Sequence, residues 1–331
     1  MRILVTGSAG FIGSNLCTKL LSQGHEVIGI DNHNDEYDVS IKEARTEELK
    51  KNPKFRFIKL DVVNDAFNSI FQNETVDYTI HLAAKDIYYD SAEMIKYTPY
   101  LVTNVVGTSK IFELSNYLKA KKFIFASTYS VYGNVKKPLL TEKKILPKPI
   151  SPHGASKMAA EEVIHFMNNF YKLPAVILRI FSVYGPGMKP HTVIPLIIDR
   201  LNRNLPIDLY SNDTTRDYIY IDDAVNYIIA SLNKRIKFQA INIASGKSTA
   251  ISQLVTEIAT IMGKDPSKVI MTKHEKDFNR LVPQTVDVSI DRAKKILHYE
   301  PKVTLTEGLK TTVEWYLAHQ DILAKSTHGT N

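Results

Sequence analysis

His153 and Lys157 stand four residues apart, in a stretch whose sequence predicts a helix over His153–Tyr171. Side chains at this spacing share one face of a helix. A neutral imidazole accepts a proton readily, and its reference pKa of about 6.5 suits a general base near neutral pH. The positive charge of Lys157 favours the neutral form of such an imidazole. The pair is therefore a candidate for acid–base chemistry.

A glycine-rich turn near the N-terminus is a second candidate site. Gly7-Ser8-Ala9-Gly10-Phe11-Ile12-Gly13 lies between a predicted strand, Arg2–Thr6, and a predicted helix, Phe11–Ser22. Glycines let the backbone approach a pyrophosphate, and a helix N-terminus supplies free N–H groups. Asp31 ends the next predicted strand, where a carboxylate hydrogen-bonds ribose hydroxyls and repels a 2′-phosphate. The turn predicts NAD rather than NADP; the alternative is a glycine-rich loop without a ligand.

The elements that must position these residues alternate along the first half of the chain. Apolar strands are predicted at Arg2–Thr6, Glu26–Ile30, Phe55–Lys59, Tyr78–Leu82, Lys122–Ala126 and Val176–Ile180. Helices are predicted at Phe11–Ser22, Ile41–Lys51, Asn64–Gln72, Pro99–Leu118 and His153–Tyr171. Such alternation is typical of a parallel sheet covered on both faces. We therefore predict an α/β fold with a Rossmann-type, doubly wound parallel sheet.

The second half is less regular and predicts a smaller, mixed C-terminal substrate domain. Its predicted helices are Thr192–Asn202, Asp222–Leu232, Ile251–Met262 and Leu305–Leu317. We assign residues 1–180 to the NAD-binding domain, 181–320 to the substrate domain and 321–331 to a flexible tail. The two domains are interleaved near 217–243, because Asp217–Ile221 and Ala240–Ile243 are candidates for strands that return to the first sheet.

Composition narrows the functional class. The chain has 331 residues, 44% of them hydrophobic and 23% charged, which is ordinary for a globular enzyme. Its net charge of +7 comes from scattered lysines, which favours a solvated surface over nucleic-acid binding. A single cysteine, Cys17, excludes an internal disulfide, and no apolar run is long enough for a membrane span. We expect a cytoplasmic enzyme without a metal; the Asp222-Asp223 pair is either a metal ligand or, more simply, a helix cap.

Eight ordered segments resemble the extended short-chain dehydrogenase/reductase family, in particular its NAD-dependent sugar-nucleotide epimerases and dehydratases. These segments are Gly7–Gly13, His81–Ala84, Asn104–Thr108, Ala126–Gly133, Ser151–Lys157, Leu178–Pro186, Arg216–Asp223 and Tyr299–Lys302. The segment Ala126–Gly133 looks most like that of the UDP-sugar and UDP-glucuronate 4-epimerases. Tyr129-Ser130 stands where the 4,6-dehydratases carry an Asp-Glu pair, so ordinary dehydration is disfavoured.

The resemblance implies inversion at C4 of a nucleotide diphosphate sugar, with NAD, through a 4-keto intermediate. It gives Thr128 the sugar O4 and Lys157 the nicotinamide ribose. His153 departs from the family, because a tyrosine normally stands there as the base. A water bridging His153 to O4, or the phenol of Tyr129, would compensate for the shorter side chain; alternatively, Tyr129 only packs. The candidate catalytic residues are Thr128, His153, Lys157 and Tyr129.

The resemblance also implies two sets of binding residues. The cofactor set is Gly7, Gly10, Phe11, Ile12, Gly13, Asp31, Asn32, Asp61, Val62, Leu82, Ala83, Ala84, Asn104 and Lys157. Within it, Asp61 and Val62 would lie near the adenine, although Asp61 could equally cap a helix near Asn64. The substrate set is Ser127, Thr128, Ser182, Val193, Tyr210, Arg216 and Arg280, the arginines facing the diphosphate or, alternatively, forming surface ion pairs.

Three functions remain open on the sequence. The first is a 4-epimerase of a nucleotide sugar, for which we expect a UDP-linked hexose, N-acetylhexosamine or hexuronate. The second is an atypical dehydratase, and the third is a sugar-nucleotide binding protein that has lost its base at His153. Uronate epimerases usually carry arginines where Gly187 and the run Lys85–Tyr88 stand here, while Lys189 is placed to meet a carboxylate. The resemblance further implies a homodimer through the helices near Pro99–Leu118 and His153–Tyr171.

Overall fold

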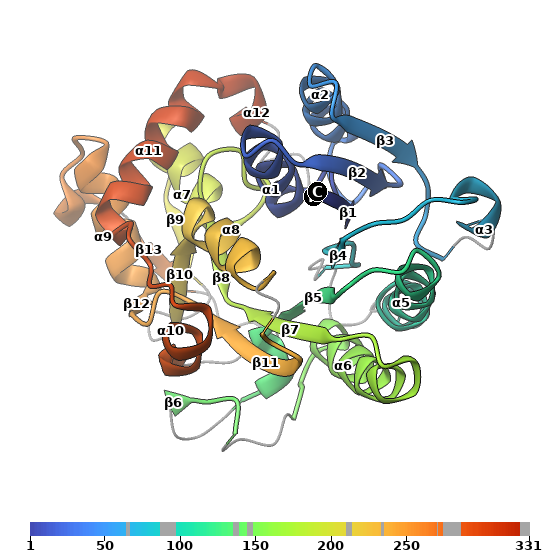
Figure 1. Ribbon diagram of the computed structural model, residues 1–331. Helices are drawn as coiled ribbons and strands as arrows, with labels where there is room; N and C mark the ends of the chain where they lie inside the picture. The colour runs from blue at the N-terminus through green and yellow to red at the C-terminus, as the bar shows by residue number, and fades with distance from the viewer. Residues whose placement is uncertain are drawn as a thin grey trace.

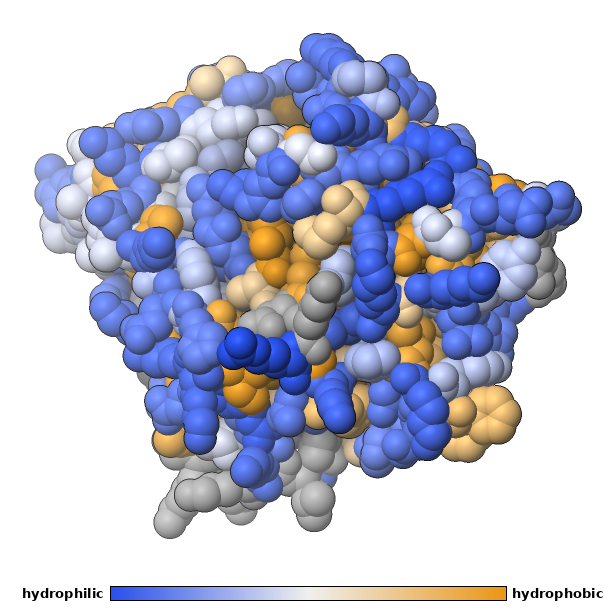
Figure 2. All heavy atoms as spheres, in the orientation of Figure 1, coloured by the Kyte–Doolittle hydropathy of each residue, from blue (hydrophilic) through white to orange (hydrophobic). Residues whose placement is uncertain are grey.

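The structure is a computed structural model, and it describes residues 1–63, 67–86, 97–134, 139–143, 148–209, 214–232, 235–269, 271–273 and 286–324. Figure 1 shows a central sheet with helices on both faces and, beside it, a second group of helices and short strands. The face seen in Figure 2 is mostly covered by hydrophilic side chains. None of the described helices combines the length and the apolar character that a membrane span requires.

The central sheet has seven parallel strands in the order β11-β7-β5-β4-β1-β2-β3. The strands are β1 Arg2–Thr6, β2 Glu26–Asp31, β3 Phe55–Lys59, β4 Tyr78–His81, β5 Phe123–Thr128, β7 Ala175–Ile180 and β11 Phe238–Ile243. The chain adds strands outward from β1 first on one side and then on the other, so the direction of winding reverses between β1 and β4. Ligands of such sheets bind at the carboxyl ends of the strands beside this reversal. The predicted Rossmann-type sheet is confirmed.

Two apolar layers enclose this sheet. On one face, Ile3 and Val5 of β1 pack towards α1 (Phe11–Ser22) and α8 (Ile221–Ala230), with α2 (Val39–Lys50) alongside α1 (Figure 1). On the other face, Leu4 packs towards α5 (Gly107–Tyr117) and α6 (Pro152–Tyr171). Successive side chains of a strand point to opposite faces, so one short apolar run supplies both layers.

One predicted helix, Pro99–Leu118, is interrupted. The structure has a short helix α4 (Thr98–Leu101), then a π-helical segment at Val102–Val106, then α5. The π segment contains the buried Asn104. A π turn inserts an extra residue into a helix and re-aims the side chains within it, often at a functional site. The first half of the chain contains one more short helix among its described residues, α3 (Phe67–Ile70).

The second part of the chain is built on short strands. The strands β8 (Ser182–Tyr184), β10 (Thr215–Tyr220) and β12 (Ser248–Ala250) form one sheet, while β9 pairs with β13 and β6 with β14. The remaining strand bounds are β6 Leu139–Leu140, β9 Ile207–Leu209, β13 Met271–Lys273 and β14 Asp287–Val288. Its helices are α7 Val193–Asn202, α9 Ile251–Ile261, α10 Asp291–Leu297, α11 Leu305–Ala318 and α12 Gln320–Ala324.

Two of the predicted segments behave differently from expectation. Residues 240–243 do return to the central sheet within β11, but the strand expected over Asp217–Ile221 does not, because β10 pairs with β8 and β12. The tail expected to be flexible from residue 321 begins with α12, whose Leu323 is buried in the core. The start of the tail is ordered because burial of the apolar Leu323 side chain holds α12 against the rest of the molecule.

Neither residue of the Asp222-Asp223 pair caps a helix. Both residues lie in the first turn of α8, which has no side-chain cap. The Asp223 carboxylate accepts hydrogen bonds from the Tyr299 hydroxyl (2.5 Å) and from the backbone N–H groups of Lys302 and Val303 (both 3.0 Å). Asp223 thus fastens the segment before α11 to the start of α8. Within the described ranges no group of three or more His, Cys, Asp or Glu side chains could hold a metal ion.

Candidate active site

The glycine turn follows β1 and has no room for larger side chains. Gly7 adopts a positive φ of 71°, and a Cβ there would lie 2.8 Å from the backbone nitrogen of Ala83. A Cβ on Gly13 would lie only 2.0 Å from the carbonyl oxygen of Gly7. The first turn of α1, which includes Phe11 and Ile12, leaves backbone N–H groups without intrahelical acceptors. The turn therefore has the geometry that a pyrophosphate needs.

Asp31 stands at the carboxyl end of β2 and faces this turn. Its Oδ2 accepts a hydrogen bond from the backbone of Ala9 (3.1 Å), and its Oδ1 accepts one from the backbone of His33 (2.9 Å). A carboxylate has about four acceptor positions, so two bonds leave capacity for ribose hydroxyls. The residues of the turn and Asp31 together fit NAD, and the buried carboxylate would oppose a 2′-phosphate.

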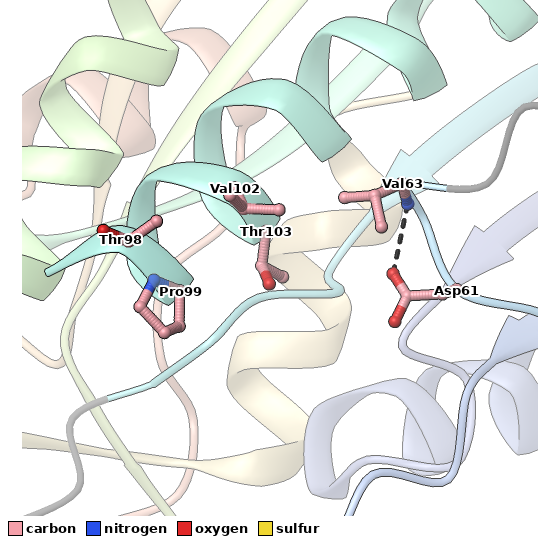
Figure 3. A pocket seen from close by; sticks show the side chains of 6 residues that line it. All are labelled: Asp61, Val63, Thr98, Pro99, Val102 and Thr103. Atoms are coloured by element: carbon pink, nitrogen blue, oxygen red, sulfur yellow. Dashed lines mark hydrogen bonds between the residues drawn. The ribbon is translucent and has the colours of Figure 1, made fainter. Parts of the chain in front are cut away.

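Asp61 and Val62 lie just beyond β3. The Asp61 carboxylate accepts from the Asn32 amide (2.8 Å) and from the backbone of Val63 (3.1 Å), so it closes a turn; Asn64, the expected start of a capped helix, lies outside the described residues. An open pocket of about 570 Å³ adjoins this turn (Figure 3). Its lining is Asp61, Val63, Thr98, Pro99, Val102 and Thr103. Its volume falls in the range of small-molecule sites, and it borders the turn for which the sequence predicts adenine contacts.

A buried chain of hydrogen bonds holds the loop after β4. The Ala83 backbone donates to the Thr6 hydroxyl (3.2 Å), which is 2.6 Å from Nδ1 of His81. Nε2 of His81 is 3.1 Å from the Thr108 hydroxyl, which donates to the Asn104 carbonyl (2.6 Å). Complete burial, and then a nearby lysine, hold the pKa of His81 well below its ordinary value. These hydrogen bonds hold the loop that contains Leu82, Ala83 and Ala84 beside the glycine turn, where the sequence predicts the cofactor.

Asn104 connects that loop to α6. Its amide nitrogen donates to the Lys85 carbonyl (3.0 Å) and to the Ser156 hydroxyl (2.9 Å), and its amide oxygen accepts from the Lys85 backbone (2.8 Å). The structure therefore shows Asn104 engaged with protein groups of the loop and of α6. Its reach to a cofactor stays a prediction.

The first turn of α6 places the candidate base and the lysine. The Ser151 hydroxyl caps the helix by accepting from the Gly154 backbone (3.1 Å), and Pro152 occupies the first turn, where it is well tolerated. His153 and Lys157 are 6% and 3% exposed, on the buried side of α6. The Lys157 ammonium donates to the Ala126 carbonyl (2.8 Å) at the end of β5. Burial lowers the pKa of Lys157 to about 8.

The tautomer of His153 follows from its contacts. Its Nδ1 lies 3.1 Å from the carbonyl oxygen of Lys85, which can only accept a hydrogen bond. Nδ1 therefore carries the proton, and Nε2 keeps the lone pair. Burial lowers the pKa of His153 below its ordinary value, although the Asp86 carboxylate opposes this effect. The ring is neutral near pH 7 and has one nitrogen ready to accept a proton.

The hydroxyl residues at the end of β5 have distinct surroundings. The Thr128 hydroxyl accepts from the Ser130 backbone (3.2 Å) and begins a 3₁₀ turn over Tyr129–Tyr132. Ser127 donates to Glu161, which forms a buried ion pair with Arg179. The ring of Tyr129 stacks on Phe181, with 5.3 Å between the centroids. The ring of Tyr129 therefore packs against Phe181, and a role of its hydroxyl in the reaction stays a prediction.

The substrate set is only partly described. Ser182 in β8 pairs in register with Tyr218 of β10, the strand that carries Arg216. The Arg216 guanidinium donates through Nη1 to the Thr215 carbonyl (2.7 Å), and Val193 is the first residue of α7. Tyr210 and Arg280 lie outside the described residues. The diphosphate contacts of this set remain predictions.

Sequence reasoning named Lys189 and the run Lys85–Tyr88 but did not predict the ionic contacts that they make around His153. Asp86 places Oδ1 3.9 Å from Nε2 of His153, and its Oδ2 is 3.0 Å from the Lys189 ammonium. Lys85 pairs with Glu36 at 3.2 Å. These residues come from the loops after β2, β4 and β8. The sequence signals were the position of Lys85 and Asp86 directly after His81–Ala84 and the expectation that Lys189 meets a carboxylate, there taken to be that of the substrate.

Comparison with known proteins gives close relatives over nearly the whole chain. Residues 3–244 match the NAD dependent epimerase/dehydratase family. The chain is 36% identical over 317 residues to the UDP-glucuronate 4-epimerase of Thermodesulfobacterium geofontis, covering 94% of this chain and 95% of that protein. Bacillus cereus UDP-glucuronic acid 4-epimerase, solved with UDP-glucuronic acid and NAD, superimposes with a TM-score of 0.87 at 31% identity, over 96% of this chain and 100% of that one. Thermotoga maritima UDP-glucose 4-epimerase, solved with UDP-glucose, gives 0.85 at 30% identity, over 97% and 100%.

Proposed function

Because the chain belongs to the NAD dependent epimerase/dehydratase family, we propose that it inverts the configuration at C4 of a UDP-linked sugar through a transient 4-keto intermediate. The observation that carries this proposal is the buried Nε2 lone pair of His153, beside Lys157 and the hydroxyls that end β5. Relatives named as 4-epimerases of UDP-glucuronate and UDP-glucose favour C4 inversion over dehydration.

Each part of the site has a task in this reaction. The glycine turn would hold the pyrophosphate of NAD, and Asp31 would hold the adenosine ribose. Bound NAD would supply the acceptor, and then the donor, of the C4 hydride. Lys157 would orient the nicotinamide ribose, and Thr128 would hydrogen-bond O4. His153 takes the proton of the 4-hydroxyl at Nε2 and returns it to O4 after the sugar has turned over.

The rival function is a binding protein without turnover. It is favoured by one observation, the replacement of the family's phenol by the shorter imidazole at position 153. A lost general base costs about 10²–10⁴ in rate. The ordered hydrogen bond from His153 to the Lys85 carbonyl argues against it, because this bond leaves the ring in the tautomer that a base requires.

NMR of sugar products tests the proposal. Purified protein with NAD would be incubated with UDP-hexoses, UDP-N-acetylhexosamines and UDP-hexuronates, beside His153→Tyr and the control His165→Phe. The control lies on the same helix, α6, and keeps the ring stack on Phe238 of β11. C4-inverted product from the unaltered protein and the control is the expected result. Product from His153→Tyr alone would contradict the role of His153. Binding of UDP-sugar with no product from any of them would show the rival function.

We also propose that the chain forms a homodimer through α4–α5 and α6. These helices expose large apolar side chains, from 40% for Val102 to 68% for Phe166 and Phe170. The rings of Phe166 and Phe170 also stack on each other, with 6.1 Å between the centroids, and exposed apolar side chains that gather in this way are typical of protein–protein interfaces. Light scattering after size exclusion should give twice the chain mass, and Phe166→Glu combined with Phe170→Glu should give a monomer.

We further propose a cytoplasmic location. The single cysteine, Cys17, is buried and free, as is common for proteins of a reducing compartment.

A further inference from the structure

Asp86 connects the candidate base to a cation from a distant part of the chain. The residue lies in the loop after β4, and half of its side chain is exposed (52%). Its Oδ1 faces Nε2 of His153 at 3.9 Å, and its Oδ2 is bound by Lys189 at 3.0 Å. The two oxygens thus have different partners, and the ion pair keeps Oδ1 turned towards the imidazole.

The distance of 3.9 Å has a different meaning in the two protonation states of His153. With Nδ1 donating to the Lys85 carbonyl, the neutral ring presents a lone pair to the carboxylate and gains no hydrogen bond. Once Nε2 has taken a proton, the ring is positively charged, and a carboxylate 3.9 Å away attracts that charge while the Nε2–H bond stays directed at O4. The carboxylate therefore favours the protonated ring selectively.

We propose that Asp86 is a positioning residue that acts through His153, stabilising the imidazolium formed when Nε2 takes the proton of the sugar 4-hydroxyl. In this step the O4–H bond breaks and the Nε2–H bond forms, and the same proton returns to O4 at the end of the cycle. The inference rests on the proposed C4 epimerisation for its catalytic meaning. In the family a single phenol acts as the base, whereas here the imidazole of His153 takes the proton and the carboxylate of Asp86 stabilises the resulting charge.

The charges that face His153 show why such a partner is needed. Lys157 on α6 and Lys189 in the loop after β8 both disfavour the imidazolium, as does burial, while Asp86 favours it. The Lys85 side chain turns to Glu36, and its carbonyl holds Nδ1. Without Asp86, a buried imidazole between two cations would be too weak a base for efficient proton transfer.

A histidine titration by ¹⁵N-edited NMR of the full chain tests the contact directly. The His153 signal is assigned by its loss in His153→Gln. We expect the Nδ1–H tautomer in the unaltered protein, a lower pKa of His153 in Asp86→Asn, and recovery in Asp86→Glu. Glu36→Gln is the matched control, because it removes a carboxylate from the same cluster that pairs with Lys85 rather than with His153. An unchanged His153 pKa in Asp86→Asn, or an Nε2–H tautomer, would overturn the proposal.

Kinetics supply the second readout. Asp86→Asn should lower kcat about tenfold with little change in KM, because only the protonated base loses its partner. The acidic limb of the pH profile should move to lower pH, since His153 then loses its proton more readily. A purely structural loop residue would leave both limbs in place. If no substrate turns over, the proposed function fails, while the titration still decides whether Asp86 acts on His153.

Discussion

The cofactor half of the site and the base half are held together by different kinds of contact. Around the glycine turn, the key contacts are close backbone packing and hydrogen bonds between the turn and the end of the neighbouring strand β2, such as the one from the Ala9 backbone to the Asp31 carboxylate. Around His153, the contacts are ionic and join loops that are far apart in the sequence, such as Asp86 to Lys189. The comparison indicates that dinucleotide binding is rigid and locally encoded, while the base depends on side chains that can be exchanged without changing the fold.

Gly13→Ala should produce the largest effect, because the cofactor half has no space to adjust. The new Cβ would lie 2.0 Å from the Gly7 carbonyl oxygen, so the turn and α1 must separate. We expect a loss of about 3 kcal/mol in the free energy of unfolding and a fall of about 100-fold in NAD affinity. Urea denaturation and calorimetric titration with NAD would measure the two effects.

Gly10→Ala is the control within the same turn. Its Cβ would lie 3.2 Å from the same Gly7 oxygen, a contact that relaxes with a shift of a few tenths of an ångström. The expected cost is about 1 kcal/mol. Equal losses in the two variants would mean that the tight packing at Gly13 does not determine how the cofactor is held.

Two buried lysines offer the next test, because burial lowers the pKa of each to about 8. Lys157 lies in the base half, whereas Lys122 donates to the Ser231 carbonyl at 3.3 Å, away from the described site residues. Lys157→Met should reduce kcat about 10²-fold or more. Lys122→Met should leave kcat within about twofold. Steady-state assays would measure kcat for both variants. An equal loss of kcat in Lys122→Met would show that removing a buried charge lowers activity wherever the lysine lies, and not only in the base half.

The same pair predicts how stability depends on pH. The folded-state pKa of about 8 lies below the ordinary value of 10.5, so between these values the unfolded chain binds more protons than the folded one. The free energy of unfolding of the NAD-free protein should therefore rise with pH from about 8 to about 10, where tyrosines begin to ionise. Each lysine-to-methionine change should flatten part of that rise.

The same contrast explains how much could be predicted from the sequence. The strands of the central sheet and the helices α1, α2 and α6 were predicted to within a few residues, because apolar runs of five or six residues and a glycine turn are local signals. The strands of the second part are mostly two or three residues long, too short for such a pattern. The segment Asp217–Ile221, a candidate strand of the central sheet, lies mostly in β10, which pairs with β8 instead. The π segment at Val102–Val106 was invisible as well, since its apolar residues continue the helical pattern.

For the site, sequence position indicated His153, Lys157 and Asp31 but not their charged surroundings. Asp86 and Lys189 are 103 residues apart along the chain and meet only through the fold. Polar residues in loops carry no periodic signal that reports which partner they face. The tautomer of His153 was equally out of reach, because a backbone carbonyl fixes it.

Tyr129→Phe should have the smallest effect and sharpens the division of labour in the base half. The change removes the phenolic hydroxyl and keeps the ring stacked on Phe181, so we expect kcat within about twofold and an unchanged free energy of unfolding. Tyr129→Ala, which removes the stack as well, should cost about 1–3 kcal/mol of stability. A 100-fold fall in kcat for Tyr129→Phe, at unchanged stability, would transfer the role of base from His153 to the phenol. The base would then be encoded in the residue next to Thr128, and the distant charged loops would serve only to close the site.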